Sequence, residues 1–355
     1  MNRLSNYIVR TVLGYTALVT LVLAALGALF LFIGQQNDIG KGSYTASQAM
    51  LFVALSLPGY LFQLLPVAAL IGALLGLGNL ARGSEILVMR ASGITTAQFC
   101  RWLGVAGILL AALMFLVGEF VAPPLGKYAR QMKAFSKFSE FSFAGSRGTW
   151  VRDGDIVIGV EQQSASASYG GVHFFRFGPD RKLLSVGRAE TASVGEDNRW
   201  QLRNYAETRF RDSGTEASRV PKEEVRSTLS PEFLGLAVVE PDAMGLRDLV
   251  SYVDHLRRND LDPVRFQTAF WARIARMTAL VLVVILALPF ALGPVRSSGQ
   301  GARTVIGILI GAGFVLFSQT MESGGQLFGL PPWLVGWLPT AGLAALTGVL
   351  LWRTR

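Results

Sequence analysis

The chain has 355 residues, of which 51% are hydrophobic and 16% are charged, and its mean hydropathy is +0.41. This composition indicates a membrane protein and excludes an ordinary soluble domain. The net charge of +9 does not imply a nucleic-acid partner, because residues 123–265 are nearly balanced, with 21 Lys or Arg against 20 Asp or Glu. The excess positive charge therefore belongs to the loops and helix ends of the apolar remainder.

Six apolar segments each approach the roughly 20 residues that a helix needs to cross a bilayer. In chain order they are Thr11–Gly34, Gly42–Ala81, Trp102–Gly118, Met277–Gly293, Thr304–Met321 and Pro332–Trp352. The second is too long for one straight span and contains Pro58 and Pro66, so we expect a kinked helix with a short entry piece near Ala49–Pro58. The first lacks the small-residue cleavage site of a signal peptide, and we expect it to stay in the chain.

The arginines outside the long insert gather at one end of the apolar segments. They are Arg3, Arg10, Arg82, Arg90, Arg101, Arg296, Arg303, Arg353 and Arg355. The short loops at the opposite end offer only Lys41. By the positive-inside rule, both termini and the loop around Arg82 are expected to be cytoplasmic, and the insert between the third and fourth segments is expected to lie outside.

The stretch Arg82–Thr96 joins the second and third apolar segments and is expected to form a short helix at the membrane surface. Ser84 is placed to cap this helix, Glu85 falls in its first turn, and Gly93 is expected to end it in the left-handed conformation. Two interpretations stay open. The helix is either a plain connector or a coupling helix, by which a cytoplasmic motor moves the membrane helices on either side.

The insert changes to β-type sequence after about Phe141. Its short stretches are rich in Val, Phe, Trp and Tyr and are separated by turn residues, which predicts an antiparallel sandwich, jelly roll or open barrel. These stretches are Thr149–Val160, Gly171–Gly178, Lys182–Val194, Arg199–Arg211 and Thr215–Thr228. A helical stripe follows at Leu246, Leu249, Val250, Val253 and Leu256, and Asp262-Pro263 starts a helix that runs into the fourth span. The chain is thus expected to divide into residues 1–140, 141–245 and 246–355.

Several chemistries lack their motifs in this sequence. Cys100 is the single cysteine, and His173 and His255 have no neighbouring metal-ligand pattern, so neither a disulfide within the chain nor a metal site is expected. No phosphate-binding loop and no Gly-x-Ser-x-Gly elbow is present. If ATP drives this protein, another subunit must bind it.

Small residues recur at helical spacing in two of the apolar segments. Gly72-x-x-x-Gly76 with Gly78, and Gly307-x-x-x-Gly311 with Gly313, allow helices to approach closely. These patterns indicate either ordinary packing within the chain or a helix that slides against a partner subunit.

Taken together, these elements resemble the LptF/LptG family, the permease subunits of the lipopolysaccharide export ABC transporter, over nearly the whole chain. The motifs that carry the resemblance are Gly42-Ser43-Tyr44, Pro66, Ala68–Gly78, Ser84–Gly93, Gly118–Pro123, Trp150 with Asp153-Gly154, Pro241–Ala243 and Gly293-Pro294-Val295-Arg296-Ser297. The first and the last of these favour the LptG branch over its LptF sister branch.

The resemblance implies six transmembrane helices with a periplasmic antiparallel β-jelly-roll domain inserted between the third and fourth. It implies a location in the bacterial inner membrane and a role in passing lipopolysaccharide to a periplasmic bridge protein toward the outer membrane. The implied partners are an LptF-type permease, an LptB-type ATPase dimer and an LptC-type membrane-anchored β protein. ATP and Mg²⁺ would be bound by the ATPase, so this chain is expected to bind no cofactor and not to be an enzyme.

The resemblance also gives the surface helix a role in coupling to the ATPase. The residues expected to serve it are Ser84, Glu85, Leu87, Met89, Arg90 and Gly93. A function of a different class stays open, namely a static membrane scaffold that anchors the β domain to its partners. Such a scaffold would need neither an acid in a surface helix nor a cationic face beside a lateral opening.

A cationic face follows the third span. On a helix, Lys127, Arg130, Lys133 and Lys137 fall within an arc of about 120°, suited to the phosphates of lipid A. The resemblance makes Arg130 and Lys133 ligand contacts, and Lys41, Arg273 and Arg276 are further candidates. Other basic positions of the family are occupied here by Leu31, Asn37, Asp38 and Gly59. A solvated helix face is the alternative interpretation.

Overall fold

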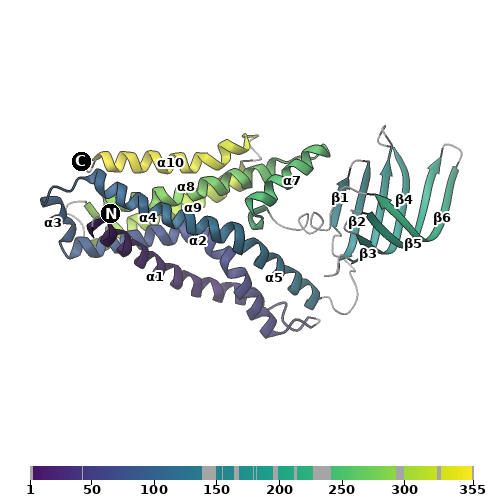
Figure 1. The fold of residues 1–355 in the computed structure, drawn as a ribbon, viewed down its shortest axis with the longest axis horizontal. Coiled ribbons are helices and arrows are strands. Elements are labelled where there is room, and N and C mark those ends of the chain that lie inside the picture. Colours follow the sequence, from purple (N-terminus) through teal and green to yellow (C-terminus); the bar gives the residue numbers. More distant parts are fainter. Residues whose placement is uncertain are drawn as a thin grey trace. The chain divides into compact units, whose positions relative to one another are not determined.

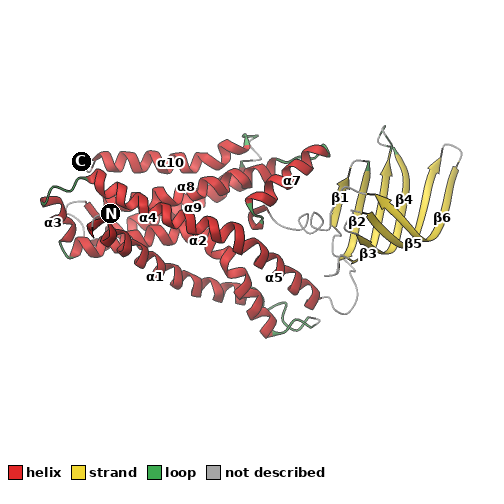
Figure 2. Ribbon diagram, in the orientation of Figure 1, coloured by secondary structure: helices red, strands yellow, loops and turns green. Residues whose placement is uncertain are grey.

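The computed structural model contains two compact units (Figure 1). It describes residues 3–41, 43–137, 149–153, 155–163, 168–178, 180, 182–194, 199–211, 214–226, 241–292, 300–325 and 329–353. The first unit comprises residues 1–39, 45–130 and 264–355, and the second comprises residues 40–44 and 131–263. Figure 2 shows that helices make up the first unit and that the strands all lie in the second. The domain bounds at residues 140 and 245 stay a prediction.

Among the described residues, six helices are long and apolar enough to cross a membrane, as the sequence predicts. The helical elements of the first unit are α1 (Arg3–Ile33), α2 (Ala46–Arg82), α3 (Glu85–Ala91), α4 (Thr96–Leu116), α5 (Ala122–Lys137), α8 (Val264–Leu292), α9 (Gln300–Gly324) and α10 (Pro332–Arg353), with the last residues of α5 counted in the second unit. The surface helix α3 has only seven residues and is too short to cross a membrane.

The second span is one unbroken helix. α2 runs through both Pro58 and Pro66, so the entry piece expected near Ala49–Pro58 is the first part of this helix and not a separate element. The Thr45 backbone N–H donates to the Gln48 side chain at 3.1 Å, which satisfies one backbone group at the start of α2.

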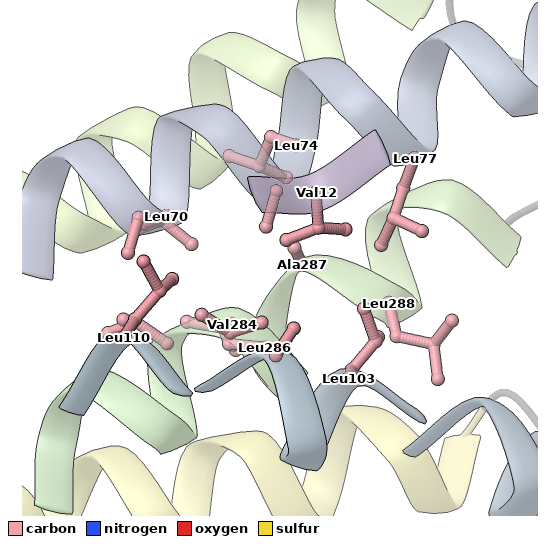
Figure 3. Packing of buried hydrophobic residues seen from close by; sticks show 14 of the residues in the cluster. Val12, Leu70, Leu74, Leu77, Leu103, Leu110, Val284, Leu286, Ala287 and Leu288 are labelled. Atoms are coloured by element: carbon pink, nitrogen blue, oxygen red, sulfur yellow. The ribbon is translucent and has the colours of Figure 1, made fainter. Parts of the chain in front are cut away.

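The core of the helical unit lies where α1, α2, α4 and α8 meet. Figure 3 shows its packing, with Val12 from α1 close to α2 leucines, and α4 leucines beside the α8 residues. The labelled members are Val12, Leu70, Leu74, Leu77, Leu103, Leu110, Val284, Leu286, Ala287 and Leu288, all nearly inaccessible to solvent. Burial of these aliphatic side chains against one another fixes the four helices as one body.

The small-residue patterns pack within the chain. A Cβ on Gly72 would lie 2.4 Å from Thr16 Cα, so this glycine lets the backbones of α1 and α2 come together. Gly307 and Gly311 of α9 lie against Leu74 and Leu70 of α2. Gly313 faces open space among the described residues. These patterns thus include ordinary helix packing, and they do not by themselves require a partner subunit.

The third span continues beyond its apolar part. α4 ends at Leu116, a π-helical turn covers Val117–Val121, and α5 follows without a break in the helix. In such a turn the backbone hydrogen bonds join residues five positions apart, and here the Ala122 N–H donates to the Val117 carbonyl. The expected helical extension of this span is therefore present, and a π-turn marks its start.

The β domain is an antiparallel sheet in which each strand pairs with its neighbours in sequence. Its described strands are β1 (Thr149–Asp153), β2 (Ile156–Gln163), β3 (Ser168–Phe177), β4 (Leu183–Val194), β5 (Arg199–Arg211) and β6 (Gly214–Arg226), and they lie in this order. The predicted stretch Thr149–Val160, which contains the turn signal Asp153-Gly154, forms the two paired strands β1 and β2, with Asp153 opposite Ile156. The inserted antiparallel domain is confirmed, and the described strands contain no crossover connection of a jelly roll.

Alternating residues of the strands form the core of the β domain. Trp200 stacks on Tyr169 with ring centroids 5.3 Å apart, and Phe174 meets Trp200 edge to face at 5.8 Å. After the sheet comes a short 3₁₀ turn at Pro241–Ala243 and then α7 (Leu246–Arg258). α7 buries Leu249, Tyr252 and Leu256, whereas Val250, which the sequence assigned to the apolar stripe, is 54% exposed.

Candidate functional site

The backbone of the α2–α4 connection departs from the sequence prediction at one end of α3. Ser84 has a φ of +58° and makes no capping hydrogen bond through its side chain, so the predicted cap is wrong. Gly93 has a φ of +88°, as expected for a residue that ends a helix, and the Ile94 N–H returns to the Met89 carbonyl at 3.2 Å. The left-handed conformation of Ser84 turns the chain sharply between α2 and α3.

The next helix has a capping box that sequence reasoning missed. The Thr95 hydroxyl accepts from the Gln98 N–H at 3.4 Å, and the Gln98 side chain accepts from the Thr95 N–H at 3.0 Å. The pattern Thr-x-x-Gln was the available signal. It fixes the start of α4 immediately after the turn at Gly93.

α3 presents two faces of different character. Ile86 and Met89 are 4% and 7% exposed and belong to the core of the helical unit. Leu87 and Val88 are 69% and 63% exposed, and Arg90 is exposed beside them. Met89 therefore anchors the helix, and the surface available to a partner includes Leu87, Val88 and Arg90, with Ser84 and Gly93 exposed at either end. Val88 was not among the expected coupling residues.

Glu85 at the start of α3 is half-buried and faces α1. The Tyr7 phenol lies near the Glu85 carboxylate. Sequence reasoning did not associate Tyr7 with this stretch, because 78 positions separate the two residues in the numbering of the chain. The contact ties the orientation of α3 to the first span.

The cationic residues after the third span lie on α5. Lys127 is exposed, whereas Arg130 and Lys133 are half-buried. The Arg130 guanidinium lies along the helix above Gly126, where a Cβ would be 3.3 Å from Arg130 Nη1. Lys137 is the last residue of α5, and its side chain lies outside the described residues.

The end of α5 is bound to the loop that carries the Gly-Ser-Tyr motif. The Ser43 N–H and the Ser43 hydroxyl both donate to the Ser136 carbonyl oxygen, at 2.7 Å and 3.0 Å. Tyr44 is 1% exposed, and Lys133 Nζ lies 6.0 Å from the centroid of its ring. Lys41 is exposed in the same loop, and Gly42 lies outside the described residues. The loop thus brings the candidates Lys41 and Lys133 into one part of the second unit.

Arg273 is a buried residue of α8 with partners inside the helical unit. It is 5% exposed, and its Nη2 donates to the carbonyl oxygen of Gly118 in the π-helical turn. Its guanidinium carbon lies 4.4 Å from the centroid of the Phe62 ring on α2, in cation–π geometry. Arg273 therefore links α8 to α2 and to the π-turn, a role that its assignment as a ligand contact did not foresee.

Arg276, one turn further along α8, is paired with an acid of α9. Its Nη2 lies 2.9 Å from both carboxylate oxygens of Glu322. The two side chains are 21% and 19% exposed, so the pair is half-buried. Sequence reasoning missed Glu322, although an acid that directly follows an apolar segment is itself a signal for a function or a partner.

The β domain contains a buried acid. Glu207 is 2% exposed, and its carboxylate accepts from Arg209 Nε at 3.0 Å and lies 3.9 Å from Arg176. Burial alone would raise the pKa of Glu207, but hydrogen bonds from Ser185 and Arg209 and the charges of Arg209 and Arg176 lower it. Burial raises the pKa of the neighbouring Tyr205 to about 12. Glu207 is thus an ionised structural residue of the sheet.

In the described part of the chain, no three His, Cys, Asp or Glu side chains form a group that could hold a metal ion. His173 contacts Glu161 at 2.6 Å, and His255 lies beside Asn259. The expectation that this chain binds no cofactor stays a prediction. The motif Gly293–Ser297 also lies outside the described residues.

Comparison with known proteins gives a family match over nearly the entire chain. The family model described as lipopolysaccharide export system permease LptF/LptG matches residues 6–353. The chain is 31% identical over 352 residues to the lipopolysaccharide export system permease protein LptG of Escherichia coli (strain K12), which covers 99% of this chain and 98% of that protein. It is 27% identical over 356 residues to the protein of the same name from Haemophilus influenzae, with 100% and 99% covered.

Proposed function

The chain belongs to the LptF/LptG family of lipopolysaccharide export permeases, and from this membership we propose that it is an LptG-type permease subunit. In this proposal it extracts lipopolysaccharide from the inner membrane and passes it to a periplasmic protein bridge. The observation that carries the proposal is the extent of the family match, which includes both the six apolar helices and the inserted β domain. Two relatives that both carry the LptG name support this branch over the LptF branch.

The proposed complex contains partners that supply what this chain lacks. An LptF-type permease would complete the membrane cavity, and an LptB-type ATPase dimer would bind ATP and Mg²⁺ beneath both permeases. An LptC-type protein and a periplasmic bridge protein would receive the lipid. The proposed orientation, with cytoplasmic termini and a periplasmic β domain, rests on the arginine asymmetry. This orientation is tested by placing a single cysteine at the exposed position Ser218 and labelling it with a reagent that cannot cross the membrane.

α3 is the proposed contact with the ATPase. Its exposed Leu87 and Val88 give an apolar patch next to Arg90, and Ile86 and Met89 hold the helix in the core. A helix anchored in this way transmits a push to α2 and α4, which flank it, because packed helices move as bodies rather than deform. Glu85 would contribute a charge-assisted bond to a basic residue of the ATPase.

α5 is the proposed contact with the anionic headgroup. Lys127, Arg130 and Lys133 follow one another at intervals of three residues and share one face of this helix, which continues the third span. Two of them are half-buried and therefore partly preorganised, which lowers the entropy cost of holding a phosphate. The further candidates from the sequence are Lys41 and Lys137 of the second unit and Arg276 of the first, whereas the fourth, Arg273, is buried against Gly118 and Phe62 and is not exposed to a ligand.

A static membrane scaffold is the alternative from a different class of function. A scaffold would hold the β domain in place without an ATPase. Co-expression with an LptF-type permease and an LptB-type ATPase separates the two functions. The proposal expects a stable complex whose ATP hydrolysis responds to lipopolysaccharide, whereas a scaffold would purify without the ATPase.

A further inference from the structure

The packing of the helical unit does not by itself explain the ion pair between Arg276 and Glu322. The two residues lie at the ends of the apolar parts of α8 and α9, since Arg276 directly precedes Met277–Gly293 and Glu322 directly follows Thr304–Met321. Half-buried ionised side chains beside apolar segments carry a desolvation cost, so this pair marks a site with a function or an internal partner. Here the internal partner is known, and the remaining question is what else the arginine can bind.

The geometry of the pair leaves part of the guanidinium available. Both carboxylate oxygens of Glu322 accept from the same nitrogen, Nη2, at 2.9 Å. In the residues that the structure covers, Nη1 and Nε of Arg276 have no hydrogen-bond partner, and the side chain is 21% exposed. Both two-donor edges of a guanidinium include Nη2, so while Glu322 occupies Nη2 a second anion can reach only a single donor, Nε or Nη1, and two-donor binding requires Glu322 to leave. A second anion can therefore approach Arg276 before Glu322 leaves.

The helix on the other side of the pair has few alternative attachments. Within the chain, only 11% of the most apolar stretch of α9 is buried, which is the lowest share among the six candidate spans. Near its start α9 rests on α2 through Gly307 and Gly311. The Arg276–Glu322 pair holds the opposite end, because Glu322 lies in the last turn of α9. Loss of the pair therefore leaves this end held by the turn to α10, where Gly325 lies against Val335, while the other end stays packed on α2.

We propose that Arg276 and Glu322 form an exchangeable latch, in which a phosphate group on a lipid headgroup displaces Glu322 from Arg276 and releases the end of α9 from α8. The proposal rests on the proposed function and names a step within it. Arginine binds phosphate and carboxylate with the same donor geometry, and a phosphate that carries more charge competes effectively for the guanidinium in a half-buried site. Proximity of the incoming anion also repels the Glu322 carboxylate, so binding and release are coupled.

Exchange predicts that replacing Arg276 and replacing Glu322 have opposite effects on lipid A binding, and the test measures both. The full chain, assembled with the partners that it needs, is placed in nanodiscs of neutral phosphatidylcholine, and the Kd is measured for lipid A that carries two phosphates. Arg276→Gln removes the phosphate ligand and should weaken binding about tenfold, the lower range for one lost charge-assisted bond. Glu322→Gln removes the competitor, keeps the shape of the side chain, and should tighten binding several-fold.

Controls separate exchange from a general loss of structure. Asp254→Asn removes the acid of the exposed Arg258–Asp254 pair on α7 and should leave the affinity unchanged. The release of α9 is followed independently by spin labels at Thr278 on α8 and Thr320 on α9, both exposed, in a Cys100→Ser background. Lipid A should lengthen this distance in the native pair, and Glu322→Gln should show the longer distance without ligand.

Each outcome bears on one proposal. If the native chain binds lipid A and both variants weaken binding, or the label distance does not respond, the pair is a fixed structural contact and the latch is wrong. If the native chain does not bind lipid A, the proposed function fails first. Inorganic phosphate and lipid A without phosphates identify the source of the anion. A response to phosphate alone supports exchange with any phosphate, and a response to lipid A only assigns it to the lipid headgroup.

Discussion

The Arg273 side chain on α8 donates a hydrogen bond to the carbonyl oxygen of Gly118 in the π-helical turn. A π-turn displaces backbone carbonyls from their ordinary helical partners, and the buried guanidinium supplies a donor for one of them. The same group stacks on Phe62, so one side chain joins α2, α8 and the junction between α4 and α5. Arg273 and the Phe62 ring therefore both contact the point where the third span continues into its extension.

Gly118→Ala tests how tightly this junction is packed. A Cβ at this position would lie 2.3 Å from the Phe62 ring and 3.2 Å from Arg273 Nη2, so the ring must move. We expect a loss of about 1–3 kcal/mol in unfolding free energy, measured by chemical or thermal unfolding in detergent. Gly104→Ala is the matched control, since Gly104 of α4 has nothing within 4 Å, and that change should be neutral or stabilising. Equal effects of the two substitutions would contradict the packing described here.

Glu85→Ala tests the role of α3 in coupling. The proposal expects weaker association with the ATPase and lower lipopolysaccharide-stimulated ATP hydrolysis, with folding and insertion retained. Tyr7→Phe is the control, because it removes the phenol that lies near Glu85 and leaves the acid in place. A small effect of Tyr7→Phe with a large effect of Glu85→Ala supports an intermolecular role. Normal ATPase association in Glu85→Ala would make α3 a plain connector.

Charge reversal on α5 tests the headgroup contact. Arg130→Glu together with Lys133→Glu should sharply reduce crosslinking to lipopolysaccharide, because each lost charge-assisted bond costs about 1.5–3 kcal/mol and the new acids repel the phosphates. Assembly of the complex should not change. Lys222→Glu on β6 is the control for net charge, since Lys222 is exposed in the β domain. Native crosslinking in the double variant would leave α5 as a solvated face.

The acid dependence of the β domain follows from Glu207. Its pKa is lowered in the folded state, so its contribution to stability is present at neutral pH and is lost as pH falls below the unfolded value toward the folded one. Glu207→Gln should lower the stability of the domain at pH 7 by about 2 kcal/mol and flatten its decline in acid. Hydrogen exchange of β5 in the full chain at pH 7 and pH 4 measures both effects. An unchanged decline in the variant would place the acid sensitivity elsewhere.

The sequence predicted the elements better than it predicted their contacts. The six spans follow from apolar length, and the strand bounds follow from turn residues, so both were close to the structure. Ser84 was assigned a cap because residue type alone suggests one, and its left-handed φ overrides that preference. Met89 was assigned to a partner surface, and only packing shows that it points into the core.

The site residues that were missed depend on tertiary structure. Glu322 was visible as an isolated acid, but its pairing with Arg276 arises only when α8 and α9 lie side by side. The position of Tyr7 next to Glu85 likewise depends on how α1 packs against the connection after α2. The sequence did not indicate that Phe62 and Gly118 contact an arginine. The π-turn that presents the Gly118 carbonyl is a local irregularity, which residue periodicity does not predict.

The central claim, that this chain is a lipopolysaccharide export permease, is tested most directly by reconstitution. The chain is assembled with an LptF-type permease, an LptB-type ATPase and an LptC-type protein in proteoliposomes that contain lipopolysaccharide, and a soluble bridge protein bearing a photocrosslinker is added outside. The account predicts that lipopolysaccharide becomes crosslinked to the bridge protein over time only when ATP and Mg²⁺ are supplied, and that omission of this chain abolishes the signal. Crosslinking that does not depend on ATP, or that persists without this chain, would contradict it.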